Sequence, residues 1–134
     1  MAFTHTILRS YTDVSGKPIS YSEAITDDSE IPSFDGSIVA AGANVQIHVA
    51  LTKANLKSVV MKCDQAVTIY TNDLSSGSPQ DTIPLTAGQA KIWTLQTDGS
   101  GACPFSDNVT TMYVSNPGGT VANLQIRGIA HQHS

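Results

Sequence analysis

The sequence predicts an all-β fold, a single-domain jelly-roll-like antiparallel β-sandwich of about eight to ten short strands. Three observations predict this class. Apolar residues recur with a period of two, as on half-buried strands. Turn-forming residues interrupt these runs about every 8–12 residues. No stretch of about 11 residues combines helical spacing with a capping residue.

The clearest predicted strand runs from Val45 to Leu51, where every second residue is apolar. Further strands are expected over residues 56–63, 67–71, 83–85, 90–95, 109–115 and 121–129. Pro84 cannot donate to a ladder, so the strand over 83–85 is expected at a sheet edge or at a strand start. The sequence from Asn116 to Gly119 predicts a hairpin that joins the last two strands.

The N-terminal third shows the same pattern more weakly, over residues 4–11 and 19–25, with a turn between them. Residues 1–17 admit two interpretations. They form either an extended arm that adds a strand to a neighbouring molecule or the first strand of the sandwich itself. One helical turn at most is expected, over residues 52–56. A length of 134 residues predicts one domain over 1–134.

The surface is expected to be rich in hydroxyl groups and poor in charge. Charged residues make up 13% of the chain, against about 25% in a typical soluble domain. The chain holds 15 Ser and 14 Thr, which suit the outward positions of strands. Lysine usually protects exposed strand edges, and there are only five. These counts favour a protein whose edges or faces are covered in its working state.

Several partner classes are disfavoured. A net charge of −4 without a basic stripe is not typical of nucleic-acid binding. The apolar runs are shorter than the roughly 18 residues of a membrane helix, and the first residues do not resemble a secretion signal. The acidic excess lies between residues 18 and 52, at Glu23, Asp27, Asp28, Glu30 and Asp35. This segment is interpreted either as a hydrated loop and edge strand or as a docking face for a basic partner.

The sequence offers few groups for chemistry, and we expect neither an enzyme nor a cofactor. No serine lies in a nucleophile motif, and the spacing of Cys63 and Cys103 fits no zinc motif. We expect Cys63 in the core and Cys103 in a loop, both reduced. The imidazoles of His131 and His133 share one side of an extended strand, so they are candidate metal ligands; the alternative is a solvated tail.

Trp93 follows Ile92 in a predicted strand, so one of the two side chains must face outward. This position is the best candidate for a ligand platform or a protein contact. The candidate contact residues as a set are Phe3, Ile7, Tyr11, Trp93, Asp27, Asp28 and Glu30.

The strand patterns over residues 56–62, 67–72, 81–88, 92–93, 109–116 and 124–126 resemble those of small β-sandwich capsid decoration (cement) proteins of tailed bacteriophages. The likeness covers about two-thirds of the chain, and no functional residue can be carried over from it. It implies a non-enzymatic virion protein, synthesised in the host cytoplasm and placed on the capsid exterior. The implied partners are the major capsid protein and further copies of the chain, as a dimer or trimer. The alternative is a carbohydrate-binding or adaptor module of a phage tail or receptor-binding apparatus.

Overall fold

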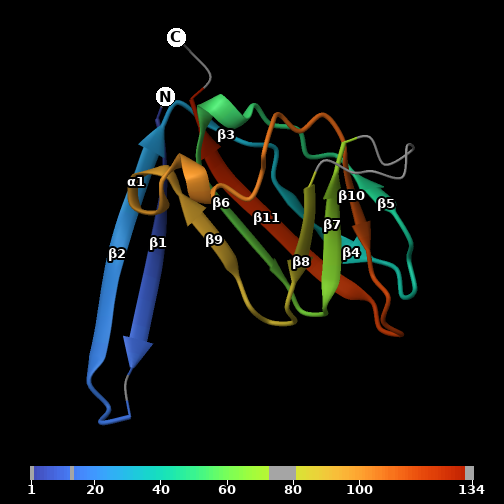
Figure 1. The fold of residues 1–134 in the computed structure, drawn as a ribbon, viewed down its shortest axis with the longest axis horizontal. Coiled ribbons are helices and arrows are strands. Elements are labelled where there is room, and N and C mark those ends of the chain that lie inside the picture. Colours follow the sequence, from blue (N-terminus) through green and yellow to red (C-terminus); the bar gives the residue numbers. More distant parts are fainter. Residues whose placement is uncertain (1, 13, 73–80, 132–134) are drawn as a thin grey trace.

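The computed structural model describes residues 2–12, 14–72 and 81–131, which form an all-β structure (Figure 1). The predicted all-β class, an antiparallel β-sandwich, is therefore confirmed. The strands are β1 (Phe3–Thr12), β2 (Pro18–Asp27), β3 (Ser29–Glu30), β4 (Phe34–Ile38), β5 (Val45–Ile47), β6 (Leu56–Cys63), β7 (Val67–Thr71), β8 (Asp81–Leu85), β9 (Lys91–Thr94), β10 (Met112–Ser115) and β11 (Ala122–Ala130). The helical turns are η1 (Lys53–Asn55), α1 (Leu95–Asp98) and η3 (Ser100–Ala102).

Two antiparallel sheets form the body of the molecule. One has the strand order β5-β10-β7-β8. The other has the order β3-β11-β6-β9, and β4 also pairs with β11. The strand β8, which contains Pro84, lies at an edge of its sheet, as predicted, so the missing donor interrupts no inner ladder.

The main core lies between the two sheets. Its centre holds fully buried side chains from both sheets, including Met61, Ile69, Met112, Leu124 and Ile126. The alternating burial along β7 and β11 explains why a period of two predicted these strands correctly. Cys63 is buried in this core and Cys103 is half-buried at the end of η3, both as free thiols. The positions expected for the two cysteines are confirmed.

The predicted hairpin between the last two strands is wrong, because β10 and β11 belong to different sheets. The connection between them is held at the end of the sandwich by Asn116, whose side chain is fully buried. Its amide Nδ2 donates to the carbonyl oxygens of Ile38, Val39 and Thr120. One side chain thereby binds three carbonyl groups at the point where the chain crosses from one sheet to the other.

The single helical turn expected over 52–56 is present as η1. Two other local details differ from the sequence-based expectation. The strand expected over 45–51 ends at Ile47, and Leu51 forms an isolated bridge to Val109. The turn α1 directly follows β9 and was not predicted; it is only four residues long, too short to show a helical period.

The strands β1 and β2 pair only with each other, from Phe3–Asp27 to Thr12–Pro18. They form a long hairpin beside β9 and α1, and its tip projects away from the two sheets (Figure 1). We call residues 3–27 the arm. The interpretation of the N-terminal segment as a strand of the sandwich is wrong, because β1 belongs to neither main sheet. Strand addition to a neighbouring molecule stays a prediction.

Candidate docking site on the arm

A second, smaller core joins the root of the arm to the sandwich. Ile7 and Ile25 of the arm bury themselves against Ile129 of β11, and partly buried Phe3, Val60 and Ile92 pack around them. Val59, Met61 and Trp93, the chain neighbours of Val60 and Ile92, face the main core. Because side chains alternate along a strand, Val60 and Ile92 lie on the outer face of their sheet. The arm therefore forms a third layer over one part of that sheet.

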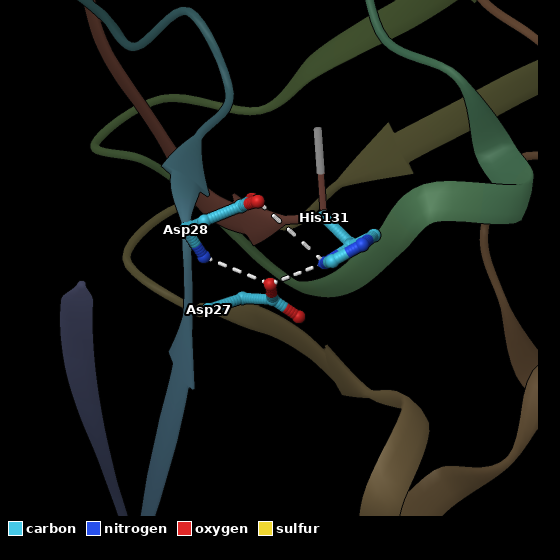
Figure 2. A group of neighbouring side chains, drawn as sticks. All are labelled: Asp27, Asp28 and His131. Carbon is cyan, nitrogen blue, oxygen red and sulfur yellow. Dashed lines mark hydrogen bonds and ion pairs between the residues drawn. The ribbon is translucent and has the colours of Figure 1, made fainter. Parts of the chain in front are cut away.

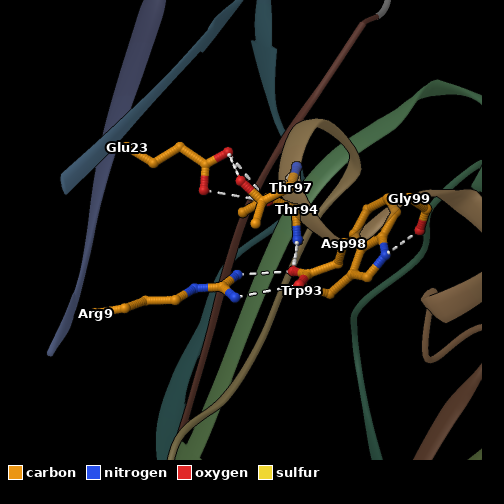
Figure 3. A network of polar contacts seen from close by, with 7 residues as sticks. All are labelled: Arg9, Glu23, Trp93, Thr94, Thr97, Asp98 and Gly99. Atoms are coloured by element: carbon orange, nitrogen blue, oxygen red, sulfur yellow. Dashed lines mark hydrogen bonds and ion pairs between the residues drawn. The ribbon is translucent and has the colours of Figure 1, made fainter. Parts of the chain in front are cut away.

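The turn α1 binds the middle of the arm through a buried carboxylate (Figure 3). Glu23 of β2 is only 5% exposed. Its carboxylate accepts hydrogen bonds from the hydroxyls of Thr94 and Thr97, the latter at 2.8 Å. The Thr94 hydroxyl also accepts a bond from the backbone of Thr97 and so caps α1. The hydrogen-bonding capacity of the buried Glu23 carboxyl group is thus satisfied by the same residues that begin the turn.

An ion pair lies beside this contact. The guanidinium of Arg9 donates two hydrogen bonds to the carboxylate of Asp98, at 2.7 and 3.1 Å. Asp98 also accepts a bond from the backbone of Thr94. The hydrogen bond from Arg9 is the main reason why the pKa of Asp98 is below its usual value, and the pKa of Arg9 is raised by the same contact. A two-point contact fixes orientation as well as distance.

The acidic segment between residues 18 and 52 is used within the fold. Besides Glu23, Glu30 contacts His5 of the arm, and Asp35 contacts Arg127. Asp27 and Asp28 both face His131, which lies just after β11 (Figure 2). All five carboxylates of the segment therefore contact side chains of the same chain. This arrangement does not favour a docking face for a basic partner, because these charges already have internal partners.

The distal half of the arm carries an exposed apolar face. Five of the seven exposed large hydrophobic side chains among the described residues belong to the arm: Leu8, Tyr11, Val14, Ile19 and Tyr21. Leu8 pairs with Ser22 on the opposite face, and Val14 lies in the turn. Tyr11 and Ile19 pair across the two strands and are 63% and 70% exposed. By strand alternation they lie on the same face as Ile7 and Ile25. We call Tyr11, Ile19 and Tyr21 the distal face.

The distal face belongs to the same side of the arm as Ile7 and Ile25. The sandwich covers this side near the root of the arm and leaves it exposed toward the tip. The opposite side of the arm is different in character, since Thr and Ser dominate it and Thr4 and Thr26 bond through their hydroxyls at 2.7 Å. Within the described residues, β1 and β2 each have a strand partner on one side only. One side of the arm is therefore built for water and the other for contact with protein.

The structure separates the candidate contact residues into groups. Phe3 and Ile7 are not available to a partner, because they pack against the chain's own sheet. Tyr11 belongs to the distal face. The sequence missed Ile19 and Tyr21 as members of this face, although they follow the same alternation as Ile25.

Trp93 is not an exposed platform, so this prediction is wrong. The side chain is 4% exposed, and its indole nitrogen donates to the carbonyl of Gly99 at 2.8 Å (Figure 3). Ile92 takes the outward position, and the arm covers it. Trp93 does line one side of a cavity of about 310 Å³, together with Leu56, Leu95 and Cys103.

One of the two predicted metal-ligating histidines lies in a group of side chains with suitable ligand atoms. His131 faces Asp27 and Asp28, and the ligand atoms of the three lie within 4.8 Å of one another (Figure 2). His133 lies outside the described residues. In the described part of the chain, no helix is long and apolar enough to cross a membrane.

Comparison of this chain with family models, with curated proteins and with solved structures found no match.

Proposed function

We propose that this protein is a non-enzymatic structural protein of a virion. It acts as a capsid decoration, or cement, protein that binds the outer surface of a shell of major capsid protein and stabilises it. It does so as a homo-oligomer, a dimer or trimer, and the arm is its docking element. The distal face is the observation that supports this proposal most directly, and the strand order of the sandwich supports the class.

We infer a jelly-roll topology from the strand order. When β4 to β11 are numbered one to eight, the sheet β4-β11-β6-β9 has the order one-eight-three-six. The sheet β5-β10-β7-β8 has the order two-seven-four-five. Two interleaved Greek keys produce this pairing, and the resulting double sheet is frequent in viral capsid and lectin domains. The topology therefore favours both the proposed virion function and its carbohydrate-binding alternative.

The arm favours a protein partner over a small ligand. An exposed apolar face on a projecting hairpin is costly in water, since each large side chain gains roughly 1.5–3 kcal/mol on full burial. Tyr11 and Tyr21 also present hydroxyls, and tyrosine is enriched at protein interfaces for this combination. Arg9 pairs with Tyr21 on this face, but its guanidinium is already engaged by Asp98.

The stabilising effect follows from selective binding. A ligand that binds only the assembled shell shifts the equilibrium away from free subunits. Many copies act together, because each one that bridges neighbouring subunits adds its own binding free energy. No chemical step is required of the protein in this function.

Co-sedimentation with shells tests the proposal. The shells are assembled from the major capsid protein encoded in the same genome. The test variant carries Tyr11→Ser, Ile19→Ser and Tyr21→Ser on the distal face. The matched control carries Val39→Ser and Val121→Ser, which change the two exposed large hydrophobic residues that the described part of the chain has away from the arm. Both variants should melt within a few degrees of the wild type, because the substituted side chains are exposed.

We expect the wild type and the control to sediment with shells and to raise their melting temperature. The distal-face variant should lose at least tenfold in affinity. If the distal-face variant binds shells as tightly as the wild type does, the proposed role of the arm is overturned. Shells that melt identically with and without the protein would overturn the proposed function.

The cavity beside Trp93 supports the carbohydrate-binding alternative. Its volume of about 310 Å³ is at the small end of ligand sites, and Lys53, Asp107 and Asn108 contribute polar groups to its lining. Trp93 is the only tryptophan, so its fluorescence reports on the cavity directly. Saturable changes in fluorescence on a glycan panel, weakened by Asp107→Asn, would favour this alternative. We expect no such change.

A further inference from the structure

Three potential metal ligands meet where the arm joins the sandwich. Asp27 ends β2, Asp28 follows it, and His131 comes directly after β11 (Figure 2). The Nδ1 atom of His131 lies 2.7 Å from Oδ1 of Asp27 and 3.8 Å from Oδ2 of Asp28. The ligand atoms of all three lie within 4.8 Å of one another. We call Asp27, Asp28 and His131 the root cluster.

Backbone contacts hold the root cluster in place. The amide of Asp28 donates to Oδ1 of Asp27 at 2.8 Å. The amide of His131 donates to the carbonyl of Asn55 at 2.8 Å, which fixes the point where the chain leaves β11. The carboxylate side chains are half-buried, and the imidazole is more exposed. Such supporting bonds orient the first ligands of a metal site, and the open side leaves room for water.

We propose that the root cluster binds one divalent cation of the zinc or manganese class, with water completing the coordination. One imidazole nitrogen and two carboxylates suit these ions. Calcium and magnesium prefer six or more ligands that are all oxygen. Metal–ligand distances of about 2.0–2.2 Å place neighbouring ligand atoms roughly 3.0–3.4 Å apart. The separations in the root cluster bracket this range, so small side-chain rotations form the site.

The local charge permits a cation. The two carboxylates carry two negative charges, and Lys57 of β6 is the cation near enough to act on Asp27 besides His131. With a neutral imidazole the group keeps a net negative charge. The metal ion replaces the direct contact between His131 and Asp27. Binding therefore joins the end of β2 to the end of β11 and ties the arm to the sandwich.

Isothermal titration calorimetry of the chelator-treated protein with ZnCl₂ and with MnCl₂ near pH 7.5 tests this site. The variants Asp27→Asn, Asp28→Asn and His131→Gln remove one ligand each and keep side chains of similar shape. The matched control His48→Gln removes an exposed histidine that lies outside the root cluster. A second control, Asp35→Asn, removes an exposed carboxylate of the sandwich.

We expect one saturable site per chain for at least one of the two ions and a higher melting temperature with that ion. Each cluster variant should weaken binding at least tenfold, and the controls should bind as the wild type does. Absence of saturable binding, or binding that survives His131→Gln, would overturn the proposal.

A measurement on the wild type avoids dependence on the folding of variants. Mn²⁺ should selectively broaden the amide resonances of residues 27–30 and 131, whereas uniform broadening would contradict the site. These experiments need no shells, so their outcome is independent of the proposed function.

Discussion

Arg9 in β1 and Asp98 at the end of α1 are 89 residues apart in the chain, and their side chains meet through two parallel hydrogen bonds. This ion pair is the charged contact that joins the middle of the arm to the sandwich. Both side chains are about a quarter exposed, so solvent screens the pair only in part. The pair allows the strength of the arm's attachment to be measured.

A double-mutant cycle with Arg9→Met and Asp98→Asn should give a coupling free energy of about 1 kcal/mol in chemical denaturation. The matched control is the cycle with Arg127→Met and Asp35→Asn. That pair has a single contact of 3.3 Å and more exposed side chains, so its coupling should be near zero. Equal coupling in the two cycles would show that the two-point geometry adds nothing.

The arm should open independently of the sandwich. Only the second, small core and a few polar contacts hold it, whereas β6 and β11 border the main core. Native-state hydrogen exchange should therefore be faster in β1 and β2 than in β6 and β11. Ile25→Ala should accelerate exchange in the arm alone, but Leu124→Ala should destabilise the whole domain by about 2–5 kcal/mol. A single common opening free energy for all strands would contradict this.

Acid should release the arm. The pKa of Asp27 is lowered chiefly by the hydrogen bond with His131, and that of Asp98 by Arg9. A carboxyl group whose pKa is lower in the folded protein than in the unfolded chain stabilises the fold. This stabilisation is complete when the pH is above the pKa of the unfolded chain, about 3.8. It is lost as the pH falls through the pKa of the folded protein. The protection factors of the arm amides, which correct for the intrinsic pH dependence of exchange, should therefore fall below about pH 4. In Asp98→Asn this fall should be smaller, and an unchanged profile in that variant would contradict the assignment.

Gly128 in β11 should not tolerate a side chain. A Cβ atom there would lie 2.4 Å from the carbonyl oxygen of Ser58 and 2.9 Å from the Ile31 side chain. Because the first obstacle is backbone, Gly128→Ala should cost about 3 kcal/mol or prevent folding. Gly119→Ala is the matched control, since a Cβ there meets nothing within 4 Å. Equal melting temperatures of the two variants would argue against the close approach of β11 and β6.

The sequence predicted those parts of the fold in which a local pattern determines the outcome. The ranges over 56–63 and 67–71 coincide with β6 and β7, because alternating burial leaves a period of two in the residues themselves. The prediction of a hairpin at Asn116 is wrong, because turn-forming residues specify a turn but do not specify which sheet the next strand joins. That choice depends on the carbonyls that the buried amide reaches, far away in the chain.

The candidate sites were only partly predictable for a similar reason. Alternation required either Ile92 or Trp93 to face outward, but the arm that covers Ile92 could not be located from the sequence. Asp27 and His131 were both noted as candidates, yet 104 residues separate them and no local spacing joins them. Tyr11 was recognised, whereas its pairing with Ile19 depends on the register of the arm.

The two strands of the arm each offer one long backbone edge that pairs with nothing else in the described chain. Such edges are templates for further strands, and lysine, proline or bulges usually block them. The arm carries little of this protection along its ten paired positions. At high protein concentration, arms of separate molecules should therefore pair with one another through these backbone groups. The yield of monodisperse protein should consequently fall as the concentration of the isolated protein rises.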